Sequence, residues 1–89
     1  MELVFFVKQD CEACVNAKQK VSFFLDKWGV TDSVPTTAVN LDTEDGLVEA
    51  AMIGVADVPT IIVKNGDDEV ARWGRKAPQS EELKAALGL

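Results

Sequence analysis

"QDCEACVNAKQK", residues Gln9–Lys20, holds both cysteines of this 89-residue chain, with two residues between them. The stretch lies between an apolar run, "LVFFV", and a segment in which apolar residues recur every three or four positions. A short apolar run is typical of a buried strand, and that recurrence is typical of a helix. Cys11 is therefore expected at the cap of the helix and Cys14 one turn into it, with both sulfurs on the same side.

The helix that follows the cysteines is predicted from one apolar stripe and one polar face. Gly29 is expected to end it, because glycine adopts the left-handed conformation of a helix terminus at low cost. The stripe consists of Cys14, Ala17, Val21, Phe24, Leu25 and Trp28. The large aromatic residues expected in the core are Phe5, Phe6, Phe23, Phe24 and Trp28.

The rest of the chain continues the alternation of strands and helices. A strand is predicted over Thr36–Asp42, a helix over residues 43–54, and a hairpin from Pro59 to Trp73 that turns at Asn65–Gly66. A last helix is predicted from "SEELKAAL", with Ser80 as its N-cap. The order βαβαββα predicts an α/β fold, a four-stranded mixed sheet with helices on both faces. Two βαβ crossovers are expected to make the strands of the first half parallel, and the hairpin to add an antiparallel edge.

Composition narrows the classes of function. Residues 1–89 are expected to form a single domain, because a chain of this length supports one core. Fifteen acidic against nine basic residues give a net charge of −6, which argues against a nucleic-acid partner. The chain has no histidine, so it cannot build a histidine-dependent catalytic dyad or triad or a histidine-ligated metal site. Cys11 and Cys14 are left as the ready nucleophiles.

Features of targeting and membrane insertion are not evident in the sequence. "MELVFFV" is too short for a secretory signal, and no apolar run approaches the roughly 20 residues of a membrane span. A cytoplasmic location without a membrane partner is therefore expected. Thiols are kept reduced there, and a disulfide is more often catalytic than structural.

Three motifs in order carry a resemblance to a known family. Cys11-Glu12-Ala13-Cys14 follows the first strand, Val58-Pro59-Thr60 opens the third, and "KNG" (64–66) and then Gly74 follow it. In this order they resemble small proteins of the thioredoxin fold, the thioredoxins and glutaredoxins. The resemblance implies a thioredoxin-like fold, a cis Val58–Pro59 bond, and binding of substrate at Val58, Pro59, Thr60 and Gly74.

The chain also departs from both groups. It starts at the strand before the motif, as glutaredoxins do, yet the glycine pair and acidic site with which they hold glutathione are not evident. Thioredoxins place a buried aspartate six residues before the first cysteine, and Phe5 occupies that position here. Asp57, directly before Val58, is expected near the sulfurs, either as a solvated charge or as one that selects substrates.

The expected activity is thiol–disulfide exchange with disulfide-bearing protein substrates. Cys11, the more exposed sulfur, would attack, and Cys14 would resolve the mixed disulfide. The N–H groups of the first helical turn favour the Cys11 thiolate, whereas Asp10 and Glu12 oppose it. The pKa of the Cys11 thiol is therefore expected only modestly below its ordinary value of about 8.5.

The protein is expected to be a monomer and to need no metal or organic cofactor, because the cysteine pair itself carries the electrons. Family resemblance implies a flavin-dependent thioredoxin reductase as the electron donor rather than glutathione, which is the alternative. Two other interpretations remain open at this point. The chain could be a glutathione-dependent glutaredoxin, or a binding module that keeps the fold without catalysis. The cysteine pair by itself also fits two small core residues, or half of a zinc site completed by a second copy. Pro59 by itself also fits an ordinary trans proline at a strand start.

Overall fold

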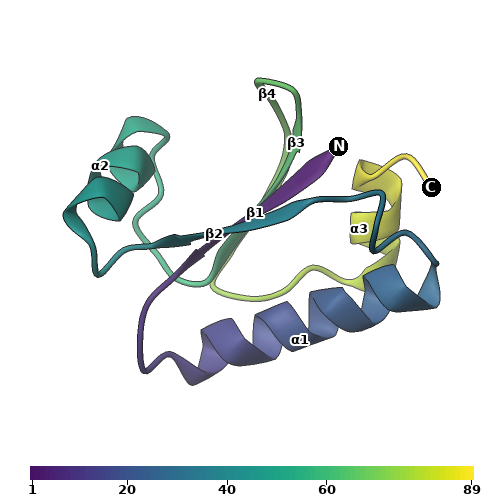
Figure 1. Ribbon diagram of the computed structural model, residues 1–89, viewed down its shortest axis with the longest axis horizontal. Helices are drawn as coiled ribbons and strands as arrows, with labels where there is room; N and C mark the ends of the chain where they lie inside the picture. Colours follow the sequence, from purple (N-terminus) through teal and green to yellow (C-terminus); the bar gives the residue numbers. More distant parts are fainter.

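The computed structural model describes residues 1–89 and contains the predicted elements in the predicted order (Figure 1). The elements are β1 (Glu2–Val7), α1 (Glu12–Lys27), β2 (Thr36–Asn40), α2 (Glu44–Met52), β3 (Thr60–Asn65), β4 (Asp68–Gly74) and α3 (Ser80–Ala86). No helix combines the length and the apolar character that a membrane crossing requires. The order βαβαββα is therefore confirmed.

The four strands form one mixed sheet in the order β2-β1-β3-β4. β1 runs parallel to β2, with Leu3 opposite Thr36, and β3 and β4 form the expected antiparallel hairpin. Figure 1 shows α2 on one side of the sheet and α1 and α3 on the other. The α/β class, the mixed sheet and the helices on both faces are thus confirmed.

One expected strand direction is wrong. β3 runs antiparallel to β1, with Phe6 opposite Thr60, so the connection from β2 through α2 to β3 is not a second parallel crossover. Periodicity identifies a helix between two strands, but it does not specify the direction in which the chain enters the sheet again. The antiparallel direction matters for function, because it places the end of β1 and the beginning of β3 at the same edge of the sheet.

The two central strands are buried on both faces, which explains their continuous apolar sequences. Side chains alternate across β1 and β3, so Leu3 and Phe5 face α1 and α3 while Phe6 faces α2. The core on the α1 and α3 face contains Leu3, Phe5, Ala17, Val21, Leu25, Val34, Ile61, Val63, Leu83 and Leu87. The core on the α2 face contains Phe6, Val39, Leu41, Ala50, Val55 and Ile62.

The α1 helix follows its predicted stripe, but one aromatic residue that was expected in the core lies outside the stripe. Its N-cap is Cys11, and it ends before Gly29, whose φ of 68° is left-handed as expected. Phe23, predicted in the core, is instead 62% exposed. At 100° per residue, Phe23 lies about 200° around the helix from Val21 and Leu25, which face the core. Its position off the stripe, rather than its apolar character, decides its exposure.

The α3 helix begins one residue earlier than predicted, because Gln79 rather than Ser80 is the N-cap. The Glu82 carboxylate accepts a hydrogen bond from the Gln79 backbone N–H at 3.1 Å. With Ser80 as the cap, the third helical position would be Leu83, which cannot return this hydrogen bond and is fully buried. The capping box that Gln79 forms with Glu82 therefore determines where the helix starts.

Arg72 on β4 connects the hairpin to the end of α2. Its guanidinium donates to the carbonyl oxygens of Ile53 at 2.8 Å and Gly54 at 3.3 Å, and it forms an ion pair with Glu69 at 2.6 Å. The hydrogen bond from Arg72 holds the pKa of the Glu69 carboxyl below its ordinary value of 4.5. This contact fixes the point from which the chain leaves α2 toward Pro59.

Arg72→Met is expected to lower the free energy of unfolding by about 1 kcal/mol, because it leaves the terminal carbonyls of α2 without their charged donor. Urea denaturation measures this, with Lys27→Met as a surface control that changes stability by less than about 0.5 kcal/mol.

Because the pKa of Glu69 is lowered in the folded state, the contribution of Glu69 to the free energy of unfolding is present above pH 4.5 and disappears as the pH falls through the lowered pKa. A deficit of Glu69→Gln relative to wild type that persisted at pH 2 would contradict this assignment.

Candidate functional site

The two cysteines form a disulfide at the first turn of α1, with their Cα atoms 5.2 Å apart. Cys11 is half-buried at the N-cap, whereas Cys14 is only 3% exposed and packs into the core. The Cys14 backbone N–H donates to the Cys11 sulfur at 3.1 Å. An approaching molecule therefore meets Cys11 first, and its sulfur lies within the positive field of the helix start.

The turn before Cys11 is anchored to the end of β2. The Gln9 backbone N–H donates to the Asp42 carboxylate at 2.6 Å, and the Leu41 N–H donates to the Val7 carbonyl oxygen at 2.8 Å. Asp10 adopts a left-handed φ of 52°, which turns the chain from the strand into the helix. This turn brings the disulfide to the sheet edge at which β1 ends.

The Val58–Pro59 peptide bond is cis, as the resemblance implies, and it leads directly into β3. The Thr60 hydroxyl donates to the Asp57 carbonyl oxygen at 2.6 Å, which closes the turn before the strand. Val58 belongs to no helix or strand, and neither its backbone N–H nor its C=O forms a hydrogen bond. The segment before β3 thus offers one unpaired donor and one unpaired acceptor of the backbone.

Gly74 lies at the same edge of the sheet, at the end of β4. It is opposite Thr60 in the pairing of β3 with β4, just as Phe6 is opposite Thr60 in the pairing of β1 with β3. The fold therefore brings Val58, Pro59, Thr60 and Gly74 to the edge at which the cysteine-bearing turn leaves β1. The structure assembles the predicted site residues, and their roles in catalysis remain predictions.

Arg75 is a neighbour of the site that the sequence did not identify. It has a left-handed φ of 70°, its backbone N–H donates to the Pro59 carbonyl oxygen at 2.7 Å, and its Nε lies 3.3 Å from the Asp57 carboxylate. Asp57 is exposed, and its carboxylate forms an ion pair with Arg75. The available signal was the pair Arg75-Lys76, two consecutive cations in an acidic chain.

The position on β1 six residues before Cys11, where thioredoxins have a buried aspartate, has no carboxylate in this chain. Phe5, at that position, is 4% exposed and belongs to the core on the α1 and α3 face. The carboxylates closest in sequence to Cys11, Asp10 and Glu12, are both exposed. No charged side chain is buried anywhere in the chain, so a carboxylate can approach the sulfurs only from the surface.

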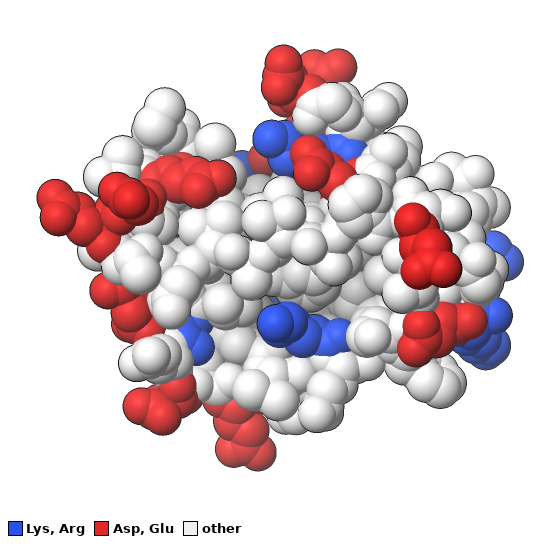
Figure 2. Space-filling view, viewed as in Figure 1, with Lys and Arg blue, Asp and Glu red and all other residues white.

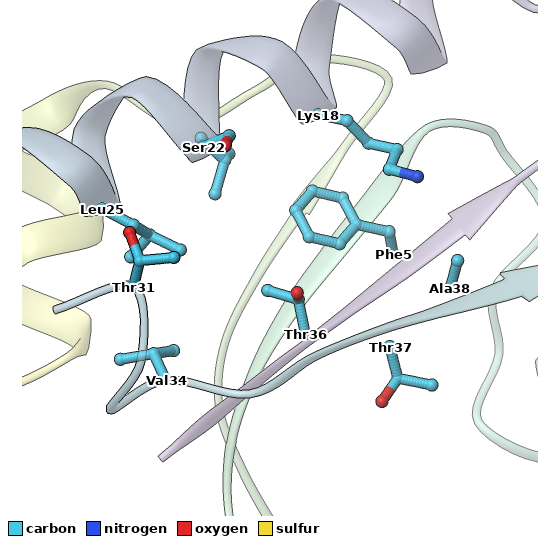
Figure 3. Close-up of a pocket in the computed structure, with 10 residues that line it drawn as sticks. Phe5, Lys18, Ser22, Leu25, Thr31, Val34, Thr36, Thr37 and Ala38 are labelled. Atoms are coloured by element: carbon cyan, nitrogen blue, oxygen red, sulfur yellow. The ribbon is translucent and has the colours of Figure 1, made fainter.

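A separate hollow lies between α1 and the edge strand β2, and Figure 3 shows its lining. Leu25 and Lys18 line it from α1, Phe5 from β1, and Thr36 and Thr37 from β2 (Figure 3). It contains neither cysteine and no residue of the segment before β3. It is therefore not part of the site at the disulfide.

Comparison with known proteins identifies the fold. No family model and no curated protein matches the sequence. Among solved structures, thioredoxin 1 from Thermosipho africanus is similar over 99% of this chain and 91% of its own, with a TM-score of 0.75 and 16% identity. An uncharacterized thioredoxin-like protein from Clostridium perfringens gives a TM-score of 0.80 at 14% identity, covering 98% of this chain and 68% of its own.

A thioredoxin from Fasciola hepatica is similar over 98% of this chain and 77% of its own, with a TM-score of 0.70 and 24% identity. At such identities the likeness establishes the three-dimensional arrangement and leaves the reaction open. The expected resemblance is confirmed at that level. The chain is thus a thioredoxin-like protein in fold, with a C-x-x-C disulfide at the first turn of α1.

Proposed function

We propose that this protein reduces disulfides in other proteins by dithiol–disulfide exchange, with Cys11 as the nucleophile and Cys14 as the resolving cysteine. The observation that carries the proposal is the arrangement of the two sulfurs. One is half-buried at a helix N-cap and the other is buried directly behind it, in bonding contact. A bridge between residues three apart closes too small a loop to stabilise the fold much, so a redox role accounts for it better.

The reaction begins from the reduced pair and balances without a cofactor. The Cys11 thiolate attacks one sulfur of the substrate disulfide, forms a mixed disulfide, and releases the other substrate sulfur as a thiolate that takes up a proton. The Cys14 thiol loses its proton and attacks the Cys11 sulfur. The Cys11–Cys14 disulfide forms, and the second substrate thiol leaves. Two electrons pass from the cysteine pair to the substrate disulfide.

The segment before β3 is suited to hold the substrate during this exchange. Val58 has an unpaired backbone N–H and C=O directly before β3, so an extended substrate segment can form main-chain hydrogen bonds with it. Thr60 holds the turn through the Asp57 carbonyl, and Arg75 holds the Pro59 carbonyl. Gly74 lacks a side chain next to this position, which leaves room for the substrate backbone.

The oxidised pair requires an electron donor for a second cycle. We infer a flavin-dependent thioredoxin reductase as the donor, acting on a monomeric protein in the cytoplasm. Support for this choice over glutathione is the run Val58-Pro59-Thr60 to "KNG" (64–66), which resembles the corresponding segment of thioredoxins. The glycine pair and the acidic site with which glutaredoxins hold glutathione are not evident in the sequence.

The test is insulin reduction driven by dithiothreitol, followed by a comparison of donors. The protein is expected to accelerate insulin reduction clearly above the rate with dithiothreitol alone. NADPH with a thioredoxin reductase is then expected to support turnover, and NADPH with glutathione and glutathione reductase is not. Efficient turnover of a glutathione mixed disulfide with no activity from the reductase would identify a glutaredoxin instead. If insulin reduction were not accelerated with any donor, the protein would be a non-catalytic binding module instead.

A further inference from the structure

A groove adjoins the disulfide on the side of α1 that faces the β4–α3 loop. Ala13, between the two cysteines, lies at one end, and Lys20 lies two turns further along the helix. Arg75 and Lys76 line the opposite side, and the small side chains of Ala17 and Ala77 leave the groove open between them. The groove therefore leads away from the reacting sulfurs along a helix with exposed charges.

The charge of the groove is opposite to that of the molecule. Its three charged residues are all cations, and no carboxylate lines it, although the chain carries a net charge of −6. Acidic side chains gather elsewhere, for example around α2 and around the turn between β3 and β4 (Figure 2). A surface with a local excess of positive charge attracts negatively charged segments and repels positively charged ones.

The cations of the groove are available to a partner. Lys20 and Lys76 form no ion pair, and both are exposed; the Lys20 ammonium lies over the Phe24 ring at 5.8 Å from its centroid, which leaves its N–H donors free for a carboxylate. The side chain of Arg75 is 76% exposed, and its Nε lies 3.3 Å from the Asp57 carboxylate, so Arg75 reaches the groove as an exposed cation with one acidic neighbour. The Arg75 backbone is in addition held by the Pro59 carbonyl, which couples the charged loop to the segment that would bind substrate.

We propose that the groove binds an acidic segment next to the reacting cysteine of the substrate protein, so that the favoured substrates are disulfides flanked by aspartate or glutamate. This proposal rests on the proposed function. From Ala13 to Lys20 the helix rises about 10 Å, and an extended chain covers about 3.3 Å per residue. The carboxylates that reach the three cations are therefore expected about three to five residues from the substrate cysteine.

The preference depends on exposed ion pairs and is correspondingly moderate. Each such pair changes an equilibrium by at most about fivefold, and salt screens it. Two or three pairs together predict a five- to tenfold higher kcat/KM for an acidic substrate at low ionic strength, and a much smaller preference at about 1 M salt. A salt-independent preference would contradict an electrostatic origin.

The experiment uses three disulfide peptides that differ only at two positions, three and four residues from the reacting cysteine, which are Glu, Gln or Lys. Wild-type protein is expected to reduce the Glu peptide five- to tenfold more efficiently than the Gln peptide, and the Lys peptide least efficiently. In Lys20→Gln/Lys76→Gln the rates for Glu and Gln peptides are expected to become nearly equal. In Lys20→Glu/Lys76→Glu the order is expected to reverse.

The matched control is Lys18→Gln/Lys27→Gln, which removes the same charge from the same protein outside the groove. Lys18 is on α1, two residues from Lys20, and lines the other hollow in Figure 3. The control is expected to keep the wild-type preference. Equal rates for Glu and Gln peptides in wild type, or a preference that survives in Lys20→Gln/Lys76→Gln, would overturn the groove proposal while reduction itself continued. If no peptide were reduced, whatever its charge, the proposed function would fail and the groove proposal with it.

Discussion

Replacing Cys11 by serine is expected to lower the rate of insulin reduction by about 10³-fold or more. A serine hydroxyl is hardly ionised at neutral pH and does not form the mixed disulfide through which electrons pass. The serine oxygen can still accept the hydrogen bond that the Cys14 backbone N–H now donates to the Cys11 sulfur. Because serine is a preferred N-cap residue, α1 should remain intact and the loss should be chemical.

The measurement is dithiothreitol-driven insulin reduction, with circular dichroism to show that Cys11→Ser is folded. Val15→Ser is the matched control, because Val15 is exposed on the same helix and lies outside the site. The control should keep activity close to that of the wild type. If Cys11→Ser retained a tenth or more of the wild-type activity, Cys11 could not be the nucleophile.

Replacing Cys14 by alanine is expected to halt the reaction at its midpoint. Without the resolving thiol, the mixed disulfide between Cys11 and the substrate has no internal route to completion, and turnover without added thiol should fall by about 10²-fold or more. Alanine is preferable to serine at this position. Cys14 is 3% exposed, so a serine hydroxyl would be buried and would need a hydrogen-bond partner.

Mass spectrometry under non-reducing conditions checks this expectation. Reduced Cys14→Ala mixed with a disulfide-bearing protein should yield a one-to-one covalent adduct through Cys11, and a small thiol should release it. The double variant Cys11→Ser/Cys14→Ala should yield no adduct. An adduct that formed faster through Cys14 in Cys11→Ser than through Cys11 in Cys14→Ala would reverse the assigned roles.

The sequence was most informative where a feature depends on neighbours along the chain. The order of the elements, the N-cap at Cys11 and the helix end at Gly29 follow from local patterns, and the structure confirms them. The sequence interpretation missed the exposure of Phe23 and the N-cap of α3 at Gln79, although local patterns carry a signal for both. Phe23 lies off the apolar stripe, and Gln79, unlike Ser80, has a glutamate three residues later.

Features that depend on tertiary arrangement were beyond the sequence. The antiparallel direction of β3 is decided by how the chain returns to the sheet after α2, and a periodic pattern carries no direction. Arg75 comes next to Pro59 and Asp57 only through the pairing of β3 with β4. The groove brings Lys20 together with Arg75 and Lys76 from the other half of the chain, so no run of basic residues in the sequence indicates it.

Electron transfer between Cys11–Cys14 and a substrate disulfide is tested most directly by counting thiols. The protein is reduced, freed of reductant, and mixed anaerobically with an equal amount of oxidised insulin; differential alkylation and mass spectrometry then follow each cysteine. The expected result is that two thiols disappear from the protein as a Cys11–Cys14 disulfide while two thiols appear in insulin. If Cys11 and Cys14 remained reduced after prolonged incubation with insulin and other disulfide-bearing proteins, the pair would not be the redox centre.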